Sequence, residues 1–168
     1  CILGSKNENY RLIKDDTRRI EFLDLEQFDA IIHLAALSND PMGDLRPDLT
    51  QEINYQATIN LAKKAKKSGV KRFIFSSSCS IYGIGKEEVV SEESPVNPLT
   101  AYARSKIQSE NDLIKMADEN FCVGILRNST VYGFSPKFRN DLVVNNLVTS
   151  GYATKKINVL SDGSPWRP

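Results

Sequence analysis

Histidine and cysteine are scarce in this sequence, and their scarcity excludes several kinds of site. The 168 residues include one histidine and three cysteines, Cys1, Cys79 and Cys122, and no two cysteines are spaced as in a CxxC motif. Structural zinc sites use Cys and His ligands at short, regular spacings, and disulfide scaffolds use an even number of cysteines. We therefore expect no structural metal and a reducing, cytoplasmic location.

The chain also lacks a long apolar run and an excess of charge of one sign. The apolar stretch from Ala30 to Leu37 is far shorter than the roughly 20 residues that span a bilayer. Lys and Arg number 22 against 21 for Asp and Glu, so there is no overall basic field of the kind that binds a phosphate backbone. The lysines between Lys63 and Lys67 share a helical segment with apolar residues on its opposite side, which indicates a solvated helix face. We expect neither a membrane nor a nucleic acid as a partner.

Short apolar segments that alternate with helical patterns predict the fold. The predicted strands are residues 29–36, 72–76, 121–126 and 157–160. The predicted helices are residues 47–68, 100–118 and 141–150. Gly69, directly after the first helical segment, fits a left-handed helix cap. Crossovers long enough to hold a helix join parallel strands, so we predict an α/β fold with a doubly wound, Rossmann-like parallel sheet.

Three residues combine into a candidate catalytic site. Tyr102 and Lys106 stand four apart on a predicted helix, so their side chains project from the same face. A tyrosine ordinarily has a pKa of about 10, and holding a phenolate near pH 7 needs roughly 4 kcal/mol, much of which a nearby ammonium supplies. Ser78 follows a predicted strand at the edge where open parallel sheets bind ligands. Such a Tyr–Lys pair also occurs on ordinary helix surfaces, and a serine after a strand also caps backbone groups.

The segments around these residues resemble a known family. They are Phe75-Ser-Ser-Ser-Cys-Ser-Ile-Tyr-Gly83 and Glu92-x-x-Pro-x-x-Pro-x-x-x-Tyr102-x-x-Ser-Lys106. Both resemble the extended short-chain dehydrogenase/reductases, in particular the NAD-dependent nucleotide-sugar epimerases and dehydratases such as UDP-galactose 4-epimerase, and the resemblance runs over nearly the whole chain. It implies that Ser78, Tyr102 and Lys106 are catalytic, with Tyr102 as the acid/base and Lys106 also holding the cofactor ribose.

The same resemblance implies which residues bind a nicotinamide cofactor. His33-Leu34-Ala35-Ala36 is similar to the strand end beside the cofactor pyrophosphate and ribose. Asp16-Thr17 is similar to the pair that contacts adenine, with Thr17 in place of the usual Val, Ile or Leu. Asn54 falls on a helix asparagine near the cofactor, and from its pattern alone it is equally an exposed helix residue. The implied cofactor is NAD, with NADP not excluded, and its ligands are Asp16, Thr17, Leu34, Ala35, Ala36, Asn54, Tyr102 and Lys106.

A nucleotide-diphosphate sugar is the substrate that the resemblance implies. The implied substrate-binding residues are Ser80, Thr130, Asn145, Asn146 and Arg167. Thr130 stands where the 4-epimerases have a substrate-binding asparagine, which leaves the sugar open. Asn145 and Asn146 are similar to the segment that holds the diphosphate, and they also fit the polar face of a helix. Arg167 falls on an arginine that forks onto phosphate oxygens.

A glycine-rich GxxGxxG turn is absent from the sequence. We therefore expect residues 1–168 to be a single fragment, incomplete at both ends. The resemblance implies an NAD(P)-binding Rossmann-like domain without its first strand and glycine-rich loop, with the start of a substrate-binding region at about 134–168. Members of the family tend to form dimers, so we expect a homodimer of the full-length protein.

The resemblance implies an epimerase that transiently oxidises its nucleotide sugar to a keto-sugar, at C4. A 4-ketoreductase uses the same three residues and remains an open alternative. A 4,6-dehydratase is disfavoured, because related dehydratases carry Thr-Asp-Glu where this sequence has Ser78-Cys79-Ser80. A non-catalytic dinucleotide-binding sensor is the alternative from another class, since a fold alone does not prove catalysis. The intact trio argues against it.

Overall fold

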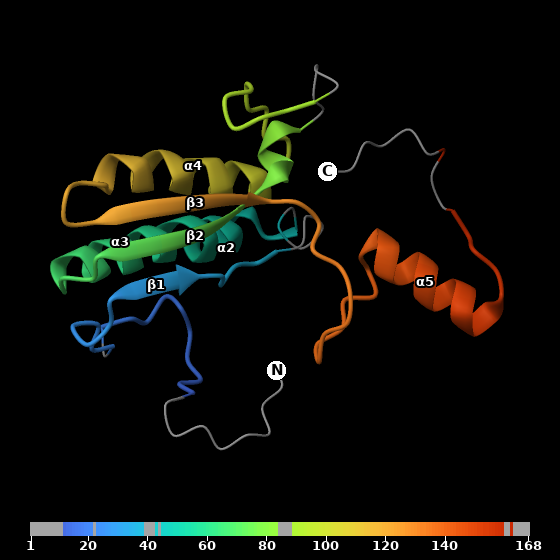
Figure 1. Ribbon diagram of the computed structural model, residues 1–168, viewed down its shortest axis with the longest axis horizontal. Coiled ribbons are helices and arrows are strands. Elements are labelled where there is room, and N and C mark those ends of the chain that lie inside the picture. The colour runs from blue at the N-terminus through green and yellow to red at the C-terminus, as the bar shows by residue number, and fades with distance from the viewer. Residues whose placement is uncertain are drawn as a thin grey trace. The chain divides into compact units, whose positions relative to one another are not determined.

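Three parallel strands form the sheet of the computed structural model, which describes residues 12–21, 23–38, 43, 45–83, 89–159 and 162. They are β1 (Ala30–His33), β2 (Arg72–Ser78) and β3 (Cys122–Asn128), in the spatial order β1-β2-β3 (Figure 1). Phe73 and Phe75 of the central strand pair with Ile31 and His33 of β1. Both phenylalanines are fully buried, so this face of the sheet is the core face.

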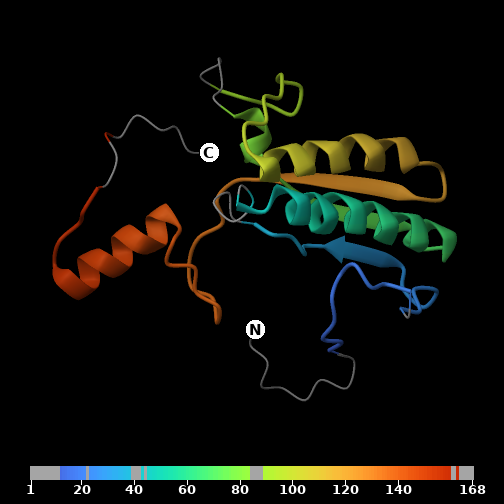
Figure 2. The same ribbon diagram turned by 180° about the vertical axis from the view of Figure 1, so that it is seen from behind.

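Helices connect the strands across that face. The first crossover contains α2 (Pro47–Thr50), a π-helical segment η1 (Gln51–Gln56) and α3 (Ala57–Lys67), and the second contains α4 (Ala101–Met116). Figures 1 and 2 show α3 and α4 side by side on one face of the sheet. The hydrophobic core on this face of the sheet contains Leu25, Ile59, Ala62, Ala65, Val70, Phe73, Phe75, Leu113 and Phe121. Gly69 ends α3 with a φ of +78°, as the sequence predicts.

The predicted Rossmann-like α/β class with a parallel sheet is confirmed. Within the described residues both crossovers lie over the same face, and the opposite face exposes Ile32 (68%) and Leu126 (52%). No described helix is long and apolar enough to cross a membrane. Among those residues, no group of three or more His, Cys, Asp or Glu side chains is placed to hold a metal ion.

The predicted solvated lysine face on α3 is confirmed for Lys63, Lys66 and Lys67, which are exposed, whereas Lys64 is half-buried. Lys64 Nζ donates to the carbonyl oxygens of Ile20 at 2.6 Å and Glu21 at 2.8 Å. Lys66 Nζ donates to Met116 O at 2.7 Å and pairs with an Asp118 carboxylate. These ammonium groups satisfy backbone carbonyls that a helix pattern does not reveal.

The chain divides into two units, Lys14–Asn128 with the sheet, and Cys1–Ile13 with Ser129–Pro168. The described part of the second unit contains α5 (Val143–Thr154), which ends at Lys155 in the left-handed conformation with a φ of +58°. The strand predicted at 157–160 is wrong over residues 157–159, which are not a strand. Ile157 and Val159 are each 63% exposed, and an apolar alternation makes a strand only where a neighbouring strand pairs with it.

Candidate active site

Ser78 lies at the junction of β2 and a short 3₁₀ turn, η2 (Cys79–Tyr82). It is the last residue of the strand and the N-cap of the turn, where its Oγ accepts a hydrogen bond from Ser80 N at 3.2 Å. The hydroxyl thus has the capping role that a serine after a strand often has. Its position at the carboxyl end of the central strand also places it where parallel sheets bind ligands.

Tyr102 and Lys106 lie on consecutive turns of α4. Thr100 caps this helix, since its Oγ1 accepts from Ala103 N at 3.1 Å, and this fixes Tyr102 in the first turn. Lys106 is buried, and its Nζ lies 5.6 Å from the centroid of the Tyr102 ring. The same Nζ donates to Ser76 O at 2.6 Å. The predicted shared face is confirmed, and Lys106 joins α4 to the strand end two residues before Ser78.

Two buried bases at this site have lowered pKa values. Burial lowers the pKa of Lys106 to about 8, and the Glu110 carboxylate acts in the opposite direction. Burial, and next the Lys106 charge, lower the pKa of His33 to about 4, so this imidazole is neutral near pH 7. His33 Nε2 lies 2.8 Å from Thr58 Oγ1. Because Thr58 donates its one hydroxyl hydrogen to Asn54 O at 2.7 Å, Nε2 is the donor to Thr58.

Asn54 is buried in η1, so the interpretation as an exposed helix residue is wrong. Its Oδ1 accepts from Leu37 N at 2.8 Å and its Nδ2 donates to Leu37 O at 3.1 Å. The amide therefore holds the segment after β1, where Leu34 and Ala35 are exposed and Ala36 is partly buried. A direct contact of Asn54 with a cofactor stays a prediction. Its two hydrogen bonds to the Leu37 backbone fix the position of this segment.

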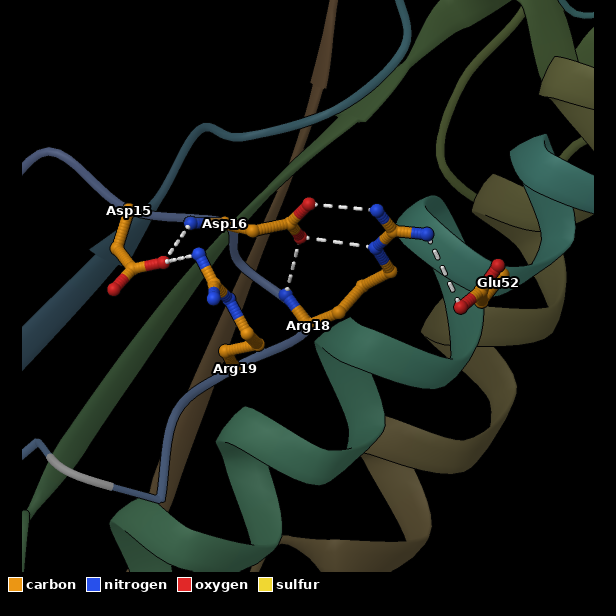
Figure 3. A network of polar contacts seen from close by, with 5 residues as sticks. All are labelled: Asp15, Asp16, Arg18, Arg19 and Glu52. Carbon is orange, nitrogen blue, oxygen red and sulfur yellow. Dashed lines mark hydrogen bonds and ion pairs between the residues drawn. The ribbon is translucent and has the colours of Figure 1, made fainter.

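Asp16, the candidate adenine ligand, belongs to an exposed charged network with Arg18 (Figure 3). Arg18 Nε and Nη2 donate to the two Asp16 carboxylate oxygens at 3.0 and 2.7 Å. This pairing lowers the pKa of Asp16 far below its ordinary value. Arg18 Nη1 also lies 3.2 Å from Glu52 Oε1, which links residues 16–18 to η1. Thr17 lies between these charged residues.

The candidate substrate residues are divided between the units. In the first unit, Ser80 Oγ is buried and finds no hydrogen-bond partner within the described chain. In the second, Asn145 accepts from Gly133 N and donates to Arg139 O, both at 2.9 Å, so its amide shapes the loop before α5. Asn146 Nδ2 donates to Asn140 O at 3.1 Å. Thr130 is partly buried, and Arg167 lies outside the described residues.

A pocket of about 220 Å³ lies within the second unit. Its lining includes Tyr132, Lys137 and Asn145, so a cation and an aromatic ring face the same space. A pocket with these groups fits a phosphate or a nucleotide base. The substrate-binding region expected from about residue 134 stays a prediction.

Sequence reasoning missed a buried ion pair beside the trio. Glu110 of α4 and Arg127 of β3 lie 2.8 Å apart between Oε2 and Nη2, and Glu110 is 1% exposed. Ser77 Oγ also donates to this carboxylate. The available signal was the spacing of Glu110, which follows Lys106 by four residues and so shares its helix face.

The fold and this constellation define a Rossmann-like domain of the short-chain dehydrogenase/reductase type. The sequence profile of the NAD dependent epimerase/dehydratase family matches residues 6–168, and the chain belongs to that family. NAD as the cofactor is thus in keeping with the family as a whole.

The curated relatives of this chain include both dehydratases and epimerases. The chain is 31% identical over 134 residues to dTDP-D-glucose 4,6-dehydratase of Mus musculus, covering 77% of this chain and 38% of the relative. It is 30% identical over 142 residues to UDP-glucose 4-epimerase 4 of Oryza sativa subsp. japonica, covering 81% and 38%. The chain thus spans less than half the length of these relatives.

A solved structure supports the fold assignment. MoeE5 in complex with UDP-glucose and NAD is 28% identical, with a TM-score of 0.78, over 92% of this chain and 52% of that protein. Its overall similarity agrees with the parallel sheet and the helix arrangement described above.

Proposed function

We propose that the whole protein is an NAD-dependent epimerase that oxidises a nucleotide-diphosphate sugar transiently at C4. The observation that carries the proposal is the buried ammonium of Lys106, which lies beside the Tyr102 ring and is anchored to Ser76 O at the end of the central strand. A cation held there favours the phenolate form of a tyrosine. Membership of the family and the similarity to MoeE5, which binds UDP-glucose and NAD, support the substrate class and the cofactor.

The residues of the chain handle the proton of the reaction. Tyr102 accepts the proton of the sugar hydroxyl and later returns it, while Ser78 donates a hydrogen bond to the same sugar oxygen. Lys106 stabilises the phenolate and contacts the nicotinamide ribose. Bound NAD would supply the hydride acceptor, and the same hydride would return to the opposite face of the keto carbon.

The described residues fit a dinucleotide. The segment after β1 is exposed at Leu34 and Ala35 at the carboxyl edge of the sheet, where such cofactors bind. Lys106 uses one of the three N–H groups of its ammonium to bond Ser76 O, and the other two can donate to a ribose. The Asp16 carboxylate is half-buried and already accepts from Arg18 on both oxygens, so its contact with adenine stays a prediction.

An epimerase is favoured over a dehydratase by the side chains next to Ser78. Elimination of water needs an acid and a base in addition to the trio, and Cys79 and Ser80 carry no carboxylate. Burial raises the pKa of the Cys79 thiol, which donates to Arg127 O at 3.1 Å and stays protonated near pH 7. The carboxylate of Glu110 is already bonded to Arg127 and Ser77.

Product analysis on the whole protein tests the proposal. UDP-glucose, UDP-galactose and related nucleotide sugars are followed by NMR with NAD, for the wild type, Tyr102→Phe and the control Tyr152→Phe, whose ring is exposed on α5. We expect inversion at C4 without net NADH, and a loss of about 100- to 10,000-fold for Tyr102→Phe only.

Each other outcome names a different function. A 4-keto-6-deoxy product indicates a dehydratase, and net consumption of NADPH indicates a ketoreductase. Dinucleotide binding without any product, unaltered by Tyr102→Phe, indicates a sensor.

A further inference from the structure

Glu110 is a buried carboxylate that the proposed reaction does not use. It lies one helical turn after Lys106 on α4 and is 1% exposed. Its oxygens accept hydrogen bonds from Ser77 Oγ, from Arg127 Nε at 3.1 Å and from Arg127 Nη2 at 2.8 Å. Charge-assisted and neutral donors together hold this carboxylate in one orientation.

Arg127 extends this network toward the segments that flank Ser78. Its Nη1 donates to Tyr82 Oη and to Glu92 O, each at 2.8 Å. Tyr82 belongs to η2, the turn that Ser78 caps, and Glu92 belongs to the segment between η2 and α4. The Arg127 guanidinium therefore connects β3 with α4, with η2 and with the segment that contains Glu92.

Stability alone is a weak reason to bury such a pair, because apolar replacements of similar volume are often as stable. The position of the pair gives it another use. Glu110 is the carboxylate that acts on the Lys106 charge from α4. The groups that face the ammonium from elsewhere are the Phe75 ring and Ser76 O on β2 and the neutral His33 on β1, none of which is anionic, together with the ring of Tyr102 on α4, the proposed acid/base.

We propose that Glu110 and Arg127 are positioning residues for catalysis: Glu110 keeps Lys106 protonated, and Arg127 orients that carboxylate and fixes the Ser78 turn against α4. The use of Lys106 in catalysis rests on the proposed function, whereas the electrostatic coupling does not. Burial already brings the pKa of Lys106 to about 8, so the loss of one nearby negative charge changes its protonation near neutral pH.

Titration of Lys106 in the whole protein without cofactor measures this coupling directly. Lysine is labelled with ¹³C at Cε, and the Lys106 signal is assigned by its disappearance in Lys106→Arg. In Glu110→Gln, which preserves the shape of the side chain, we expect the Lys106 midpoint to fall by about one pH unit. The control is Asp112→Asn on the same helix, whose carboxylate bonds Tyr55 and Lys115 instead and whose loss leaves the midpoint unchanged.

Arg127→Met is the reciprocal variant. It leaves Glu110 without its guanidinium partner, so the carboxylate acts more strongly on Lys106 and the midpoint rises above the wild-type value. Opposite shifts for the two variants separate the coupling from general loosening, which moves both midpoints the same way. If Arg127→Met does not fold, Arg127→Lys retains the charge, and its midpoint stays nearer to the wild-type value than that of Glu110→Gln.

Equal midpoints for the wild type and Glu110→Gln overturn the proposal, and so do shifts in the same direction for both variants. Turnover adds an independent readout: the alkaline limb of kcat/KM moves to lower pH in Glu110→Gln together with the Lys106 midpoint. A wild-type protein that turns over no nucleotide sugar refutes the proposed function, while the titration still decides the role of Glu110.

Discussion

Ser77 and Ser80, on either side of Ser78, have opposite hydrogen-bonding states. Ser77 Oγ donates to the buried carboxylate of Glu110. Ser80 Oγ is equally hidden from solvent, yet it has no partner among the described groups. A buried hydroxyl without a hydrogen bond costs roughly 1–3 kcal/mol. Such a group lowers the stability of the fold, and its contact with substrate stays a prediction.

The two serines therefore predict different consequences of the same substitution. Ser80→Ala removes an unsatisfied hydroxyl, so we expect an unchanged or slightly higher Tm together with a lower kcat/KM for the nucleotide sugar. Ser77→Ala takes a donor from a buried carboxylate, and we expect a loss of about 1–3 kcal/mol. Thermal unfolding and steady-state kinetics of both variants test this. Equal destabilisation by the two substitutions contradicts the assignment.

Contacts between residues close in sequence could be predicted from their spacing, whereas contacts between residues far apart in sequence could not. The four-residue spacing of Tyr102 and Lys106 sets their shared face, and the structure has Lys106 beside the Tyr102 ring. Glu110 and Arg127 carry charges that normally indicate solvent exposure, and they meet only because β3 packs beside α4. Asn54 was equally ambiguous, since its partner Leu37 lies 17 residues earlier.

Among the elements, η2 ends just before Gly83, where the backbone of Asn97 passes very close to the chain. This glycine has a φ of +61°, and an added Cβ would lie 2.1 Å from Asn97 O. Asn97 N in turn donates to Ile81 O at 2.8 Å, so the segment before α4 is fastened to the turn that begins at Ser78. The close approach leaves no room for a side chain at position 83.

Gly83→Ala is therefore expected to destabilise the protein by about 2–5 kcal/mol, through both the positive φ and the clash. Gly69→Ala is the matched control, because its φ is +78° and no atom lies within 4 Å of an added Cβ. Only the conformational penalty of about 1–2 kcal/mol applies there. Urea unfolding of the two variants gives both values, and a similar loss for the two glycines would argue against the clash.

The repeating order of strands and helices was predictable, because buried parallel strands are short apolar runs and the helices carry a periodic apolar face. The ends of the strands were harder to predict: β2 continues to Ser78, two residues beyond the predicted strand, since its backbone pairs with β3 as far as Asn128. The π-helical segment η1 contains Asn54, whose amide bonds the backbone of Leu37, and no local sequence pattern predicts this contact. At residues 157–159 an apolar alternation exists without strand structure.

At the scale of the whole molecule, the single histidine, His33, makes a distinct contribution to how the free energy of unfolding depends on pH. The folded state resists protonation of His33 until about pH 4, whereas the unfolded chain takes up this proton at its ordinary pKa of 6.5. The unfolded state thus binds more protons between these values, and the free energy of unfolding decreases as the pH falls through this window, by up to about 3 kcal/mol.

We expect His33→Gln, which retains a donor for Thr58, to reduce the decrease of stability between pH 6.5 and 4. Urea unfolding at several pH values on the wild type and the variant measures it. No other histidine of the chain contributes to this window. Parallel pH dependences for the two proteins would exclude His33 as the source.

The hydrogen bond from Lys106 to Ser76 O has a consequence for the energetics of ligand binding. In the folded chain Lys106 is 3% exposed, so its ammonium group has lost most of its bound water before any ligand arrives. The dehydration is a cost of folding and is not repeated on binding. For the proposed reaction, a ribose or sugar oxygen would meet a fixed dipolar environment that needs little solvent reorganisation, which is the condition under which a single charge has its largest effect on a transition state.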